Sequence, residues 1–90
     1  MEGCTSKNFE RFLMEGWEAV FEINGVNFFY ERSGNEDGFH LDLYKQDIQI
    51  LNKDIDSMDE CLDTVLSTEV FEGRQLRDCY DNMIVTDLIE

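Results

Sequence analysis

Residues 17–32 have the sequence WEAVFEINGVNFFYER, in which two runs of alternating apolar residues meet at Asn24 and Gly25. An Asn-Gly pair favours a type I′ turn, because both central residues then need positive φ, which these two types tolerate best. We therefore expect a β-hairpin. Counting outward from the turn pairs Ile23 with Val26, Glu22 with Asn27, Phe21 with Phe28, Val20 with Phe29, Ala19 with Tyr30, and Glu18 with Glu31. A shift of one residue would bury the glutamates, so the turn and the pattern specify the same register.

A third strand is expected over residues 39–44, after a polar loop bounded by Gly34 and Gly38. Its apolar residues alternate with polar ones, which predicts a three-stranded antiparallel meander with one apolar face. Residues 45–55 leave two interpretations open: they extend the third strand past a bulge, or they form a short edge strand.

Helices are expected before and after the meander in the sequence. From Ser6 onward, Phe9, Phe12 and Leu13 share one helical face, and Gly16 lies where a C-cap glycine belongs. A second helix is predicted over residues 57–67, because Ser57 followed by Glu60 forms a capping box.

A third helix is predicted from about Arg74 to Met83, with Leu76 and Tyr80 on its apolar side, and residues 84–89 are expected to dock, as a short strand. The order α-βββ-αα makes an α+β fold, with helices over a sheet face that must be covered. At 90 residues, the chain is expected to be a single small acidic domain.

The chain contains 21 acidic and seven basic residues, for a net charge of −14. Such a charge opposes the approach of nucleic acid and of anionic lipid, so it predicts a basic protein surface as the partner. Solubility alone is the alternative explanation, although about 2–8 charges serve a small domain. The three cysteines form no CxxC pair and leave an odd one over, which favours a reducing cytoplasm. No apolar segment approaches the length of a membrane span and no signal region is evident, so we expect no membrane association.

Catalysis and metal binding have little support. The single histidine, His40, is expected on the outer face of the third strand, and nothing marks a nucleophile and a base as a set. Residues 52–63 echo a calcium-binding EF-hand loop, but Ser57 replaces the glycine at position 6 and Asp63 replaces the glutamate at position 12. We expect no enzyme activity, no cofactor and no metal.

The outer face of the meander is the predicted partner-binding surface, because charges steer an encounter and aromatic side chains add affinity. Its residues are Glu18, Glu22, Phe29, Glu31, Glu36, Asp37, Asp42 and Tyr44. The competing interpretation is that the first helix packs on this face and buries Val20 and Phe29 as ordinary core. An alternative acidic face is formed by Asp54, Asp56, Asp59, Glu60 and Asp63.

Two stretches resemble small acidic proteins of phages and mobile elements of Gram-positive bacteria. The front half carries Phe12 and Leu13 followed by FEINGVNF at residues 21–28, and the back half carries SMDECL at 57–62 and VFEGRQLRD at 70–78. The resemblance implies a bacterial host cell and, as for some members, an anti-CRISPR or other anti-defence inhibitor. It transfers no functional residue.

Such inhibitors present carboxylates where a nuclease such as Cas9 expects phosphates, a DNA-mimic mode that fits the charge of this chain. In this chain the acidic residues are concentrated in two regions and are not spread along the whole sequence. This favours a compact inhibitor that fills one basic pocket, in place of a mimic as long as a DNA duplex. The alternative function is an immunity-type or housekeeping interaction module of a mobile element with no anti-defence role.

Overall fold

The turn at Asn24 and Gly25 joins the first two strands of the sheet. In the computed structural model, which describes residues 6–35 and 38–89, φ is +52° at Asn24 and +82° at Gly25. Strand β1 (Glu18–Ile23) pairs antiparallel with β2 (Val26–Asn35), from Ile23 opposite Val26 to Ala19 opposite Tyr30. The five pairs given by the structure confirm the predicted register.

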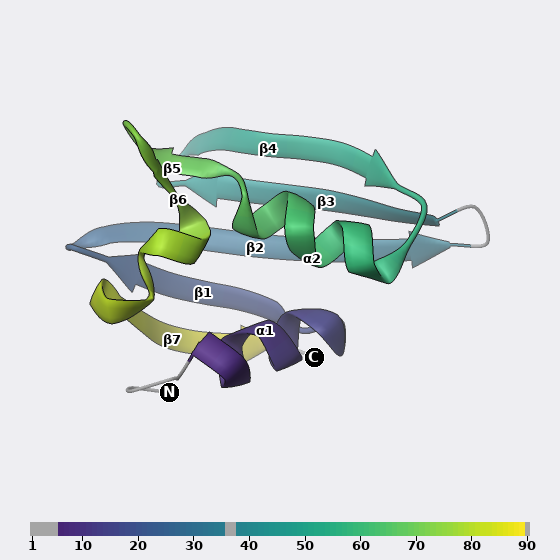
Figure 1. Cartoon of the computed structure of the whole chain (residues 1–90), viewed down its shortest axis with the longest axis horizontal. Helices are drawn as coiled ribbons and strands as arrows, with labels where there is room; N and C mark the ends of the chain where they lie inside the picture. Colours follow the sequence, from purple (N-terminus) through teal and green to yellow (C-terminus); the bar gives the residue numbers. More distant parts are fainter. Residues whose placement is uncertain (1–5, 36–37, 90) are drawn as a thin grey trace.

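The sheet contains five antiparallel strands, so the expectation of three is wrong (Figure 1). Strands β3 (Gly38–Lys45) and β4 (Ile48–Ile55) extend it on one side, and β7 (Met83–Ile89) pairs with β1 on the other. The order is β4-β3-β2-β1-β7. Within residues 45–55, Lys45 ends β3, residues 46–47 form a turn, and residues 48–55 form an edge strand. The C-terminal segment docks as a strand, as expected.

The predicted helix from Arg74 to Met83 is wrong. A two-strand hairpin, β5 (Glu69–Phe71) and β6 (Arg74–Gln75), is followed by the 3-10 turns η1 (Leu76–Asp78) and η2 (Tyr80–Asn82). The Asp78 carboxylate accepts from the Gln75 N–H at 3.2 Å, and the Cys79 N–H donates to the Leu76 carbonyl at 3.0 Å. These tight i→i+3 turns place apolar residues at nearly helical spacing, which explains the error.

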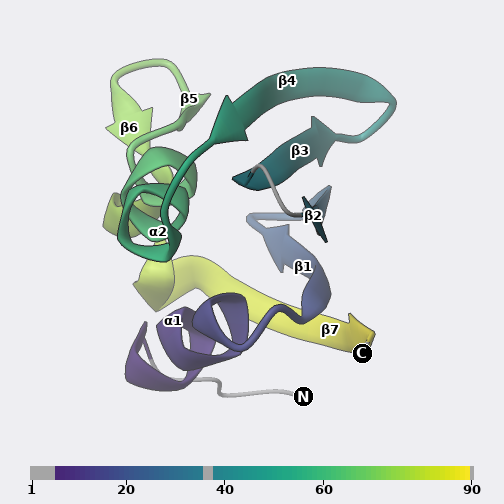
Figure 2. The same cartoon turned by 90° about the vertical axis from the view of Figure 1, so that its right-hand side faces the viewer.

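Two helices, α1 (Ser6–Met14) and α2 (Met58–Leu66), cover the same face of the sheet (Figure 2). Phe9 of α1 packs its ring edge-on against Phe21 of β1, with centroids 5.4 Å apart. The interpretation that α1 covers the opposite face is therefore wrong. The Ser57 hydroxyl accepts from the Glu60 N–H at 3.3 Å and caps α2, which is the Ser57 half of the predicted capping box. Neither helix of the described residues is long and apolar enough to cross a bilayer.

Arg32 of β2 links the sheet to both helices through its guanidinium group. Its guanidinium donates to the carbonyl oxygen of Leu13 at 3.2 Å, contacts the Met58 sulfur at 2.8 Å and lies 5.0 Å from the centroid of the Phe39 ring. A cation is favourable at the C-terminal end of a helix such as α1. The sheet and its helix layer are thereby held together, and the other sheet face is left open.

Candidate partner-binding face

The open face is the side of the five-stranded sheet opposite the helices, and the sheet curves so that this face is on the outside (Figure 2). Strand alternation sends one residue in two to it, while Ala19, Phe21 and Ile23 point to the buried core. The charged and aromatic residues that alternation and the strand pairing place on the open face are Glu18, Glu22, Phe29, Glu31, His40, Asp42, Tyr44, Asp54 and Asp87.

Three carboxylates form a row across β1, β2 and β3, which we call the carboxylate row: Glu18, Glu31 and Asp42. Glu31 lies directly opposite Asp42 in the strand pairing, and all three border a hollow of about 240 Å³. Neighbouring strands are about 4.8 Å apart, so the row places one negative charge at about that interval. Like charges facing each other across strands destabilise a sheet, so folding alone does not explain this arrangement.

Polar neighbours hold the end of the row at Asp42. Gln49 donates to an Asp42 carboxylate oxygen at 2.6 Å, and the His40 Nε2 lies 3.4 Å from the other oxygen. The His40 Nδ1 lies 2.7 Å from the Asp54 carboxylate. The hydrogen bond to Asp54 raises the pKa of His40 above its ordinary value of 6.5, and the charge of Asp42 adds to the effect. His40 therefore gains a proton more readily than a free histidine.

An aromatic row, formed by Phe29 and Tyr44 and continued on β1 by the aliphatic Val20, runs beside the carboxylate row on the same strands. Val20 lies opposite Phe29, and Phe29 lies opposite Tyr44. The two rings stack with centroids 6.3 Å apart and planes 23° apart. Phe29 is half-buried by its neighbours in the sheet, and both helices lie on the other side. The row offers apolar surface that a partner could cover.

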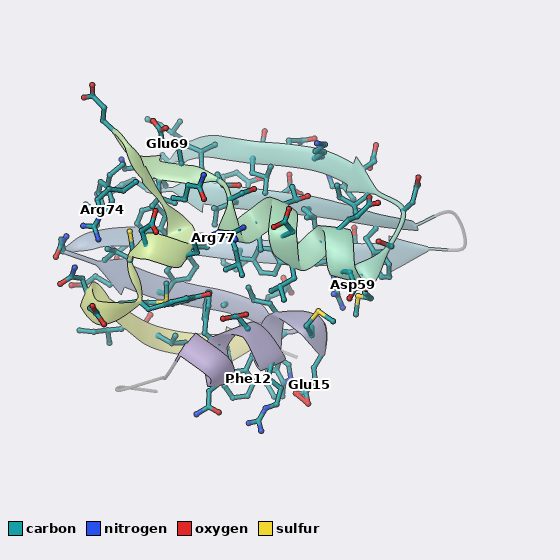
Figure 3. The ribbon with its side chains drawn as sticks, in the orientation of Figure 1. Phe12, Glu15, Asp59, Glu69, Arg74 and Arg77 are labelled. Carbon is teal, nitrogen blue, oxygen red and sulfur yellow. The ribbon has the colours of Figure 1, made fainter. Side chains whose placement is uncertain are left out.

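Basic residues are distributed unevenly between the two sides. Six of the seven lysines and arginines have described side chains, and none of these six projects from the open face. Lys45, for example, donates to the Val70 carbonyl at 2.7 Å on the helix side. Figure 3 looks onto the helices and labels Arg74 and Arg77 there together with Asp59 and Glu69. The helix side thus carries both signs, whereas His40 is the only described base on the open face.

The alternative acidic face is also assembled by the fold. All five of its predicted residues, Asp54, Asp56, Asp59, Glu60 and Asp63, line one groove of about 440 Å³ between β4 and α2. Its charge is partly compensated, because Lys53 lines the same groove and Arg77 pairs with Asp63 at 2.9 Å. The open face is the less neutralised of the two surfaces.

Sequence reasoning placed most of the candidate residues together. Glu18, Glu22, Phe29, Glu31, Asp42 and Tyr44 share the open face, whereas Glu36 and Asp37 lie outside the described residues. Strands β4 and β7 add residues to this face that the sequence did not predict there: Asp54, Asp87, Ile84 and Ile89, the last two being 42% and 40% exposed. The alternation of Met83 and Val85 with their polar or exposed neighbours was the signal for β7.

The EF-hand echo in residues 52–63 does not form a loop between helices. Its first residues belong to β4 and its last to α2, with only the short link 56–57 between them. Within residues 6–35 and 38–89, no group of three or more His, Cys, Asp or Glu side chains is arranged to hold a metal ion. The segment therefore lacks the helix–loop–helix arrangement of an EF-hand.

Comparison of the chain with family models, with curated proteins and with solved structures gives no match.

Proposed function

We propose that this protein is a non-enzymatic acidic inhibitor that binds a basic surface of a nucleic-acid-handling protein, such as a CRISPR-Cas nuclease, in place of nucleic acid. The observation that carries the proposal is the open face, on which His40 is the only described base among many carboxylates. The origin in a phage or mobile element belongs to the same proposal and depends on the sequence resemblance.

Nucleic-acid-handling proteins carry binding sites for the phosphates of the nucleic acid backbone. They hold the nucleic acid backbone mainly with lysine and arginine, at a phosphate spacing of about 3.4 Å of helix axis for each strand. The carboxylate row presents a charge about every 4.8 Å across the strands. The protein thereby offers a rigid acidic surface to the same basic side chains, and bound protein excludes nucleic acid.

The aromatic row and the curvature of the sheet support a compact plug. Phe29 and Tyr44 lie beside the carboxylates, and aromatic residues surrounded by polar ones supply affinity once the charges have steered the encounter. The open face is on the outside of the curve, a shape that fits a concave basic site.

The experiment measures displacement of labelled DNA from a panel of purified CRISPR nucleases and restriction endonucleases. Three variants each remove three negative charges. The open-face variant is E18Q/E31Q/D42N, and the groove variant is D56N/D59N/E60Q. The control variant is E15Q/E69Q/E72Q, whose residues are exposed and lie outside the five-stranded sheet.

We expect the unmodified protein to displace DNA from at least one enzyme, and the open-face variant to be at least about tenfold weaker, the effect of losing about 1.4 kcal/mol. The control variant should retain its potency. The proposal is wrong if no enzyme of the panel releases DNA, or if all three variants weaken equally. Binding to one co-encoded toxin and to no enzyme of the panel would support the immunity-type alternative instead.

A further inference from the structure

We propose that the open face selects arginine over lysine on its protein partner. This inference rests on the proposed function only in taking the partner to be basic, and it names the side chain that the face recognises. The occupant is a segment of the partner that presents arginine side chains to the carboxylate row and the aromatic row together.

The carboxylate row and the aromatic row are adjacent on the open face. On each of three strands, a carboxylate and an apolar residue are two positions apart on the same face: Glu18 and Val20, Glu31 and Phe29, Asp42 and Tyr44. Residues two apart in a strand are separated by about 6.7 Å. A side chain that pairs with Glu31 or Asp42 therefore lies beside a stacked aromatic ring.

The side-chain cations of arginine and lysine differ in shape and in hydration. Guanidinium is flat and weakly hydrated, stacks on aromatic faces and forms two parallel hydrogen bonds with a carboxylate, whereas ammonium is a compact and strongly hydrated point charge. A ring beside a carboxylate satisfies both preferences of guanidinium. Lysine gains from the carboxylate alone.

Carboxylates of the row must also be free of ion pairs within the protein if they are to bind a cation of the partner. The ion pairs within the described part of the chain are those of His40 with Asp42 and Asp54, and that of Arg77 with Asp63. Glu18 and Glu31 have no such cation there, and both border the hollow of about 240 Å³. Arg32 also borders it, but its guanidinium is held at the Leu13 carbonyl. Of the two carboxylates beside the rings, Asp42 is held by His40 and Gln49, whereas Glu31 has no ion-pair partner among the described residues and is open to a cation of the partner.

The test uses two peptides of equal length and charge, a Gly-Ser repeat carrying arginines and the same repeat carrying lysines. Their affinities for the intact protein are compared by fluorescence anisotropy. We expect the arginine peptide to bind about fivefold more tightly, the gain of one or two exposed cation–π contacts. Equal affinities, or binding of neither peptide, would overturn the inference.

Variants assign the preference to the rings. F29L/Y44L should lower the affinity for the arginine peptide to that for the lysine peptide and leave the latter unchanged. Y44F, which keeps the ring, should retain the preference. F12L is the matched control, since Phe12 is an aromatic residue of the helix side and contacts Trp17. If circular dichroism shows that F29L/Y44L is unfolded, the comparison of the two peptides on the unmodified protein and on Y44F still tests the preference for arginine.

The outcomes separate this inference from the proposed function. Displacement of DNA from an enzyme with equal affinity for the two peptides would mean that the face responds to charge alone, and the arginine inference fails. A preference for arginine without displacement from any enzyme of the panel would leave the inference standing and remove the proposed function.

Discussion

Phe29 and Tyr44 stack across the β2–β3 pairing, with ring centroids 6.3 Å apart, on the sheet face that no described helix covers. A stacked pair is favourable by about 0.5–1.5 kcal/mol beyond the burial of its area. The pair therefore stabilises the sheet modestly while presenting apolar surface beside the carboxylate row. This double role gives the first prediction.

Phe29→Leu should lower the free energy of unfolding by about 1 kcal/mol, because the stacked contact is lost while most of the apolar volume remains. Phe21→Ala, at a fully buried core position, should cost about 3–5 kcal/mol. Urea denaturation of both variants provides the comparison. Equal losses would mean that Phe29 is ordinary core and would contradict its assignment to the open face.

Glu31→Gln should stabilise the fold, because Glu31 lies directly opposite Asp42 and the facing charges repel each other. The expected gain is about 0.2–1 kcal/mol in the free energy of unfolding. Glu69→Gln, at an exposed position of β5, serves as the control and should change stability little. The same Glu31 variant should bind the arginine peptide more weakly. A loss of stability with unchanged binding would argue that the carboxylate row is structural.

The pKa of His40 should lie above 6.5, chiefly because of its hydrogen bond with Asp54. Because the folded pKa is the higher one, the stability contributed by protonated His40 is fully present below about pH 6.5 and is lost as the pH rises through the folded value. An NMR titration of the ring measures this, and the chain has one histidine. Asp54→Asn should lower the pKa. A titration at or below 6.5 in the unmodified protein would contradict the geometry.

Gly25→Ala should destabilise the hairpin, since φ is +82° at Gly25 and a side chain there is strained. The expected cost is about 1–2 kcal/mol, the penalty for a left-handed residue with a Cβ. No atom within 4 Å would meet the added methyl group, so the cost comes from the backbone alone. Thermal unfolding measures it. An unchanged melting temperature would mean that the turn does not depend on positive φ.

The hairpin could be predicted because its signals are local. The turn chemistry of Asn24 and Gly25 and the alternation on both sides of them specify one pairing, and the open-face positions of Glu18, Glu22, Phe29 and Glu31 follow from it. Asp42 and Tyr44 followed from the alternation of the next strand. These positions required no knowledge of distant contacts.

The length and pairing of the edge strands could not be predicted from their residues, although a short strand was expected over 84–89. β4 is mostly exposed, so it lacks the alternation that marks a half-buried strand. β7 pairs with β1 at sequence separations of 60 to 71 positions, and a register shift between Val20 and Phe21 interrupts the pairing. Tertiary contacts determine such strands, and this is why Asp87 was missed and Asp54 was assigned only to the alternative acidic face.

The most direct test of the open face as the binding surface is an NMR titration of methyl groups with the arginine peptide. We expect shifts at Val20, Ile84 and Ile89, which lie on the open face, and none at Val70, which is buried on the helix side. The account is contradicted if the shifts fall instead on Ile55 and Thr64 in the groove between β4 and α2, or spread evenly over both sides of the sheet.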